Sequence, residues 1–150
     1  MENITIAVGC DHEGHDMKVQ LVQYLSRKGI SVIDVGTNNS TNAVDYPVYA
    51  KLVCDKVLSG EAQRGLLICE SGIGMSMAAN RFKGIRCAVC HDYFGVLMTR
   101  EHNDCNVLAL GGKVIGIEVA KQVVDTYLST RFLSEHPNHP RRVDLLNSYP

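Results

Sequence analysis

The 150-residue chain has neither an excess of charge of one sign nor a long apolar run. Its 15 Lys and Arg residues nearly balance its 16 Asp and Glu residues. Without a basic excess, nucleic acid and membrane surfaces are not expected as partners. No apolar run approaches the roughly 20 residues that span a bilayer. The polar start, Met1–Asn3, does not resemble a secretory signal. The sequence therefore predicts a globular protein.

The sequence also lacks the paired cysteines of a zinc site or a disulfide framework. Most of the six cysteines lie in apolar runs, where cysteine packs as a small hydrophobe. This usage is typical of a reducing compartment, and we expect a cytoplasmic protein. Cys87 and Cys90 have the spacing of a redox or metal pair. In a strand, however, residues three apart point to opposite or nearly opposite sides. A thiol redox enzyme is therefore a disfavoured hypothesis, and no metal site is expected.

Short apolar runs alternate with amphipathic segments of helical length. We expect strands over residues 4–8, 31–35, 65–69, 85–90 and 107–110, and helices over 13–28, 47–59, 72–81, 93–100, 114–128 and 141–147. Strands that are apolar throughout favour a parallel sheet covered on both faces. With right-handed crossovers, the fold class is α/β: a three-layer, doubly wound, Rossmann-like sandwich with a five-stranded parallel sheet and a C-terminal helical tail. The length predicts one domain, residues 1–150.

In open α/β sheets, ligands bind beyond the carboxyl ends of the strands. This rule selects four segments: Gly9–His12, Cys69–Gly74, His91–Asp92 and Gly111–Lys113. The polar run Arg100–Asp104 precedes the fifth strand and should lie at the opposite end of the sheet. If that run acts in catalysis, a second subunit would supply it to its neighbour's site.

The strongest local feature is Cys69–Gly74. Glycines at a strand-to-helix turn let backbone N–H groups face a ligand, and the helix N-terminus adds positive potential that stabilises a thiolate. The alternative is a tight turn with an inert buried cysteine, and the segment alone leaves both interpretations open. It lacks the spacing of a P-loop or a dinucleotide fingerprint. It also has Met75 where a cysteine phosphatase would need an arginine.

Other polar segments have two interpretations each. Asp11 and His12 could orient or protonate a sugar oxygen, although Asp11 could equally cap a helix, and Asp45 has the same ambiguity. The run His102–Asp104 could be a loop with Asx-type hydrogen bonds.

The tail contains further polar residues. His136 and His139 stand in a proline-rich linker and are expected on the surface. Arg141 and Arg142 begin a helix, where the helix dipole disfavours positive charge, so they indicate an anionic group nearby.

Several motifs together resemble the type B ribose-5-phosphate isomerases. The matching segments are Gly9–His12, Asp45–Pro47, Cys69–Ser76, Ala78–Asn80 and His102–Asp104. The resemblance covers nearly the whole chain and weakens after Phe132. It implies a homodimer or a dimer of dimers with shared active sites. It also implies reversible conversion of ribose 5-phosphate to ribulose 5-phosphate without a metal or nucleotide cofactor. The wider family includes isomerases of allose 6-phosphate and galactose 6-phosphate.

The resemblance also implies residue roles. Cys69 would be the base that moves a proton between C2 and C1, with Ser71 beside it to shuttle protons at the oxygens. Partner-subunit His102 would assist ring opening, with Asn103 next to it. The remaining substrate contacts would come from side chains that hold the sugar and from backbone amides that hold the enediolate: Asp11, His12, Tyr46, Glu70, Gly72, Ile73 and Gly74.

Three departures from the family pattern concern charge. Glu70 replaces a typical glycine, and a carboxylate there disfavours a thiolate unless the side chain turns outward. Lys113 replaces an arginine that often contacts phosphate, which keeps the charge but loses the bidentate fork. Arg142 matches one phosphate-binding arginine, whereas Asn138 stands where another is usual and the segment is two residues longer. The tail, residues 133–150, is expected to pack on the partner subunit.

These departures leave two alternatives to ribose-5-phosphate isomerisation. The preferred substrate could be a six-carbon aldose phosphate. The chain could instead be a catalytically silent module that binds sugar phosphates, with the thiol disabled by Glu70.

Overall fold

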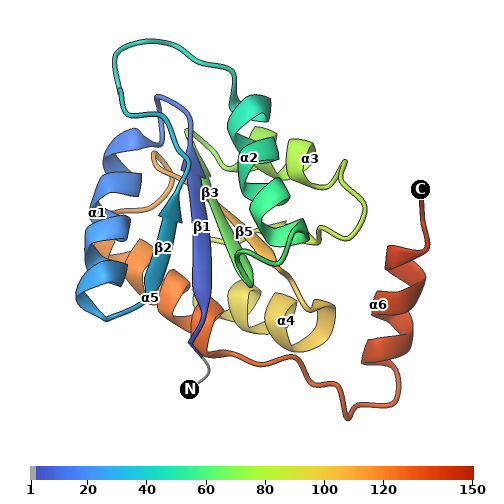
Figure 1. Ribbon diagram of the computed structural model, residues 1–150. Helices are drawn as coiled ribbons and strands as arrows, with labels where there is room; N and C mark the ends of the chain where they lie inside the picture. Colours follow the sequence, from blue (N-terminus) through green and yellow to red (C-terminus); the bar gives the residue numbers. More distant parts are fainter. Residues whose placement is uncertain (1–2) are drawn as a thin grey trace.

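The computed structural model describes residues 3–150 and shows strands and helices in alternation (Figure 1). Met1 and Glu2, which form part of the polar start noted above, lie outside the described residues. The strands are β1 (Thr5–Cys10), β2 (Ser31–Asp34), β3 (Arg64–Cys69), β4 (Cys87–Val89) and β5 (Val107–Gly111). The helices are α1 (His15–Arg27), α2 (Tyr46–Leu58), α3 (Ile73–Ala79), α4 (Tyr93–Asn103), α5 (Ile117–Ser129) and α6 (His139–Asn147).

The strands form one parallel sheet in the order β2-β1-β3-β5-β4. The central strands are almost wholly buried, which explains why their sequences are apolar throughout rather than alternating. The chain moves outward from β1 to β2 and then returns to place β3 on the other side of β1. The carboxyl ends of β1 and β3 therefore flank the switch point where a doubly wound sheet binds ligands. The predicted α/β class is confirmed.

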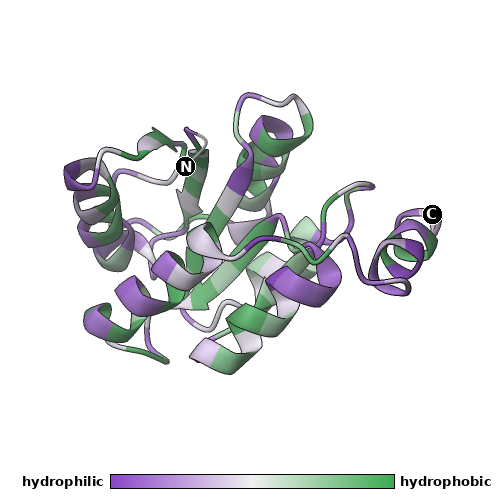
Figure 2. Cartoon of the chain, turned by 90° about the horizontal axis from the view of Figure 1, so that it is seen from below, coloured by the Kyte–Doolittle hydropathy of each residue, from purple (hydrophilic) through white to green (hydrophobic). Residues whose placement is uncertain are grey.

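Two hydrophobic clusters fill the two faces of the sheet. One lies between the sheet and α1, α4 and α5, and the other between the sheet and α2 and α3. Seen from below, the hydrophobic strands run through the centre and the helices flank them (Figure 2). Cys87 packs against the second cluster and Cys90 against the first, so the two thiols face opposite sides as expected. Burial raises the pKa of Cys90 to about 11, which further disfavours a reactive pair.

Several predicted boundaries are wrong: β4 is shorter than residues 85–90, and helices α4, α5 and α6 begin or end elsewhere than expected. Helix α4 continues past Arg100 to Asn103, so His102 and Asn103 form its last turn rather than a loop, and Asp104 caps it with φ 48°. Helix α5 begins at Ile117 rather than residue 114, because the amides of Val114 and Ile115 bond to Gly111 in a turn. Helix α6 begins at His139 because a proline is favourable in the first helical turn.

Helix α6 stands apart from the sandwich and contacts α4 (Figure 1). Val143 is buried in this contact, and Arg86 Nη1 donates to Asn147 Oδ1 at 3.2 Å. Leu145, Leu146 and Tyr149 remain about half exposed or more. Within residues 3–150, no helix has both the length and the apolar character needed to cross a membrane.

Candidate active site

The carboxyl end of β1 carries two of the predicted substrate-binding residues. Asp11 is 6% exposed, and its Oδ1 accepts the N–H groups of Glu13 (3.0 Å) and Gly14 (3.1 Å) at the start of α1. Asp11 thus closes the turn that precedes α1 but is not its N-cap, which is Gly14, so the capping interpretation is wrong. The carboxylate's second oxygen can accept from a ligand. His12 Nδ1 accepts the Val44 N–H at 3.1 Å, so Nε2 carries the proton in the neutral ring. His12 can thus donate from Nε2.

The carboxyl end of β3 places the Cys69 sulfur inside a glycine turn. Cys69 is 5% exposed, and the Gly72 N–H points at its Sγ at 3.1 Å. This N–H fixes the position of the sulfur, and the thiolate is the form of cysteine that acts as base or nucleophile. The contact requires Gly72 to adopt the left-handed conformation, φ 80°, as the N-cap of α3.

The turn after β3 is locked to the turn after β5. The Gly112 N–H donates to the Cys69 carbonyl at 2.8 Å, and the Lys113 N–H donates to the Glu70 carbonyl at 3.1 Å. A Cβ on Gly72 would lie 2.9 Å from the Leu110 carbonyl carbon, so only glycine permits this approach. The backbone that surrounds Cys69 is therefore rigidly fixed by β5.

Two further predicted residues line the same turn. The Ser71 Oγ accepts the Ile73 N–H at 3.2 Å, which leaves its hydroxyl proton free to rotate toward a ligand. The Tyr46 ring lies over Gly74, where an added Cβ would approach it to 2.9 Å. Among the described residues, the Asp45 carboxylate makes no capping bond to α2. The structure thus brings Tyr46 to the glycine turn and does not support a capping role for the Asp45 side chain.

Glu70 turns away from the sulfur. Its Oε1 lies 3.0 Å from Lys113 Nζ, and both side chains are more than half exposed. Lys113 Nζ also lies 3.2 Å from Glu13 Oε2. The outward orientation meets the condition set by the sequence for a carboxylate next to a thiolate.

His91 and Asp92, which also follow a strand, have structural roles. The Gly111 N–H donates to His91 Nε2 at 2.8 Å, and burial lowers the pKa of His91. The Asp92 carboxylate accepts the Gly95 N–H at 2.7 Å and caps α4. Both side chains therefore support the site rather than line it.

His102 and Asn103 lie at the other end of the sheet, as expected. They border a small hollow of about 180 Å³ together with Arg142 and His139 of α6. Cys69 pairs with Gly111 and Gly65 with Val107, so the length of β5 separates the two groups. At about 3.3 Å per residue this separation is roughly 15 Å. One chain thus does not bring Cys69 and His102 together.

Three histidine rings stack beside that hollow. The centroids of His102 and His139 are 4.4 Å apart, and those of His139 and His136 are 3.9 Å apart. His139 is buried, so the prediction of a surface position is wrong for it, although His136 is exposed. Burial lowers the pKa of His139, and the neighbouring His136, His102 and Arg142 lower it further. The sequence contains no signal for this stack, because it forms only when the tail packs against α4.

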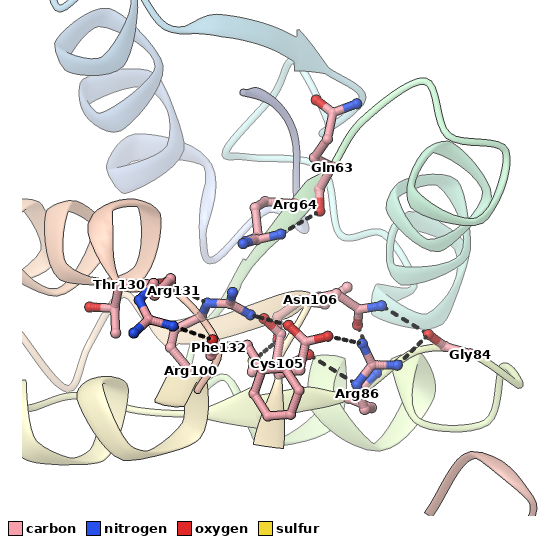
Figure 3. A network of polar contacts seen from close by, with 12 residues as sticks. Gln63, Arg64, Gly84, Arg86, Arg100, Cys105, Asn106, Thr130, Arg131 and Phe132 are labelled. Atoms are coloured by element: carbon pink, nitrogen blue, oxygen red, sulfur yellow. Dashed lines mark hydrogen bonds and ion pairs between the residues drawn. The ribbon is translucent and has the colours of Figure 1, made fainter. Parts of the chain in front are cut away.

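A polar network holds the end of α4 that carries His102 (Figure 3). Arg100 is 1% exposed and donates to the carbonyls of Cys105 (2.6 Å) and Thr130 (3.1 Å). Asp104 accepts from Arg100 at 2.9 Å and from Arg86 at 3.2 Å. These bonds satisfy a buried guanidinium and fix the last turn of α4, so His102 is presented on a rigid support.

Comparisons with known proteins identify the family of the chain. The family model described as Ribose/Galactose Isomerase matches residues 6–146. Ribose-5-phosphate isomerase B of Escherichia coli is 44% identical over 143 residues, covering 95% of this chain and 94% of that protein. Galactose-6-phosphate isomerase subunit LacB of Clostridium acetobutylicum is 37% identical, covering 86% of this chain and 74% of that one.

A solved structure shows the same fold. The ribose 5-phosphate isomerase of Thermotoga maritima superimposes with a TM-score of 0.94 at 42% identity and covers 99% of this chain and 100% of its own. Both the sequence and the fold therefore match. The chain belongs to the ribose/galactose isomerase family and is an enzyme of the isomerase class.

Proposed function

We propose that this isomerase interconverts ribose 5-phosphate and ribulose 5-phosphate, with Cys69 as the general base. The observation that carries the proposal is the position of the Cys69 sulfur at the carboxyl end of β3, 3.1 Å from the Gly72 N–H. A relative that is named as a ribose-5-phosphate isomerase and matches nearly the full chain supports the same substrate.

The chemistry requires a base and a place for an oxyanion. In the ring-opened aldose, the Cys69 thiolate takes the proton from C2, and the electron pair moves through C1 to the carbonyl oxygen. The Cys69 thiol, whose proton can exchange with water, then delivers a proton to C1 while a proton passes from O2 to O1, which gives the ketose. Ser71 is the group we assign to the transfer between the oxygens. Among the backbone amides at residues 70–74, those that do not already donate to Cys69 Sγ or Ser71 Oγ would stabilise the enediolate, at about 3–4 kcal/mol for each well-placed donor.

Side chains from two other segments would hold the sugar. The free oxygen of Asp11 and the Nε2–H of His12 offer an acceptor and a donor to sugar hydroxyls. Tyr46 covers the glycine turn and limits the depth of the site. Together these groups would fix the carbon chain so that C2 lies close to the Cys69 sulfur. Holding the reacting atoms together in this way lowers the barrier to proton transfer.

We further propose that the site is completed by a second copy of the chain, in a homodimer or a dimer of dimers. His102 and Asn103 would enter the neighbour's site to open the sugar ring, and Arg142 with Lys113 would hold the phosphate. Two observations support this: the separation of Cys69 from His102 within one chain, and the large exposed apolar side chains on α3, α4 and the tail, namely Ile73, Met77, Tyr93, Phe94, Leu145, Leu146 and Tyr149. In this assembly, residues 1–150 form one domain whose tail, residues 133–150, packs on the partner.

The test is a substrate panel with two readouts. Ribose 5-phosphate, allose 6-phosphate and galactose 6-phosphate are each incubated with enzyme and chelator in deuterated water. We expect ribose 5-phosphate to give the highest kcat/KM and to incorporate deuterium at the transferred position. A higher kcat/KM for a six-carbon sugar would make that sugar phosphate the preferred substrate instead. The six-carbon sugars are included because one relative is named as a galactose-6-phosphate isomerase subunit. Binding without turnover or exchange for every sugar would refute the isomerase mechanism.

A further inference from the structure

A chain of charged groups crosses the edge of the sheet beside Cys69. Lys113 Nζ lies 3.0 Å from Glu70 Oε1 and 3.2 Å from Glu13 Oε2. The other oxygen of Glu13 lies 3.8 Å from His12 Nε2. We call these four residues the rim network. It joins the segments that follow β1, β3 and β5, the same three segments that form the site.

The backbone places the members of the rim network next to one another. The Lys113 N–H donates to the Glu70 carbonyl at 3.1 Å, and the Glu13 N–H donates to Asp11 Oδ1 at 3.0 Å. Because these bonds fix the Cα positions, the lysine needs little extra ordering to reach both carboxylates. Pairing with Glu70, and next with Glu13, raises the pKa of Lys113, so the ammonium stays charged.

The charge balance of the rim network is negative. Two carboxylates surround one ammonium, and His12 is a neutral donor when Nδ1 accepts the Val44 N–H. A ligand that carries a phosphate dianion would approach an ammonium whose charge is already shared by two carboxylates. The third N–H of the ammonium can still reach a phosphate oxygen, but the phosphate then lies beside two like charges and competes with them for the cation.

We propose that Glu70, acting through Lys113, sets the affinity of the site for phosphorylated ligands by competing with the phosphate for the ammonium group. The inference rests on the proposed function for the identity of the ligand. Glu70 is the stronger competitor because its oxygen is closer to Nζ and its carbonyl also holds the Lys113 backbone. The residue is thus an affinity determinant that touches the cation rather than the reacting atoms.

The size of the effect follows from exposure. Both partners are more than half exposed, and exposed ion pairs are weak, so the effect on affinity should be at most roughly fivefold. Removing the negative charge of Glu70 should therefore tighten phosphate binding by about two- to fivefold. The gain should shrink at high salt, because added ions screen exposed charges.

The experiment measures inorganic phosphate binding by titration calorimetry and the KM for ribose 5-phosphate. The variants are Glu70→Gln, Glu13→Gln, Lys113→Gln and the double variant Glu70→Gln with Lys113→Gln. The matched control is Glu118→Gln, which removes a carboxylate that pairs with Lys121 at 3.0 Å on α5. We expect Glu70→Gln to lower both the phosphate Kd and the KM two- to fivefold, with a smaller effect for Glu13→Gln and none for Glu118→Gln. The gain should vanish in the Lys113→Gln background.

An unchanged phosphate Kd in Glu70→Gln would overturn the inference, as would a gain that persists without Lys113. A fall in kcat with no change in phosphate affinity would assign Glu70 to the thiol and overturn it as well. The two proposals fail separately. If the wild-type protein turns over none of the sugars while Glu70→Gln still tightens phosphate, the proposed function fails and the role of Glu70 stands.

Discussion

The imidazole of His102 stacks on that of His139, with 4.4 Å between the ring centroids and 26° between the planes. His102 belongs to the sandwich and His139 to the tail helix, so this contact couples the two. The third ring, His136, covers the far side of His139 at 3.9 Å. The central ring, His139, resists protonation, because it is buried and because a charge on it would be repelled by the neighbouring positive groups.

This stack predicts a pH dependence of stability. Burial, with His136, His102 and Arg142, lowers the pKa of His139 below its usual 6.5. The unfolded chain therefore binds a proton more readily than the folded one, so stability falls as pH drops through 6.5 toward the lower folded value. His139→Phe keeps an aromatic ring but cannot titrate. We therefore expect the decrease in Tm between pH 7.5 and pH 5 to be smaller for this variant than for the wild type. An equal decrease in Tm for the variant and the wild type would contradict the prediction. The control is His15→Phe on α1, outside the stack, which should show the same decrease in Tm as the wild type.

Cys69 provides a test of the mechanism. Cys69→Ala should retain the fold, since the side chain is small and its backbone bonds to Gly112 remain. Loss of the base should lower kcat by about 10²- to 10⁴-fold. Cys90→Ala, which removes a thiol on the opposite face of the sheet, should leave kcat near the wild-type value. Isomerisation at the wild-type rate by Cys69→Ala would remove Cys69 from the mechanism.

The fold could be predicted because its signals are local. Apolar runs such as Gly65–Cys69 and helical spacing are legible in sequence, and the rule for parallel sheets then locates the ligand edge. The side of the sheet on which Cys69 and Lys113 meet follows from the same rule.

The remaining features depend on contacts between distant segments. The burial of His139 requires α6 to fold back on α4. The length of α4 depends on a hydrogen bond from Arg100 to the carbonyl of Thr130, 30 residues later. Nothing in the sequence distinguishes Glu13, because a glutamate near a helix start is ordinarily a solvated residue. Its role depends on Lys113, which is 100 residues away in the chain. Contacts between such distant residues leave no periodic pattern in the sequence, so they cannot be predicted from it.

Subunit complementation tests the shared site. Cys69→Ala and His102→Ala each inactivate one half of the proposed composite site, so a mixed dimer contains one intact site. With random exchange, half of the dimers are mixed, and activity should recover to roughly a quarter of the wild-type level for an isologous dimer. The measurement is kcat after co-refolding the two variants, with exchange verified by native mass spectrometry. Verified exchange without recovery would show that each chain builds its own site.

Two glycines with the same backbone conformation allow the cost of left-handed strain to be measured apart from the cost of a steric clash. Gly72 and Gly29 both have φ 80°, but a Cβ on Gly72 would lie 2.9 Å from the Leu110 carbonyl carbon, whereas one on Gly29 would meet nothing within 4 Å. Gly29→Ala should therefore cost only the left-handed strain, about 1 kcal/mol. Gly72→Ala should cost more, because the turn must also move away from β5 and cannot keep its N–H on the Cys69 sulfur. Urea denaturation of both variants measures the two costs, and kcat should fall for Gly72→Ala alone. Equal destabilisation by the two substitutions would show that the turn yields freely, and the contact between β5 and the turn would then not be what holds Cys69 in place.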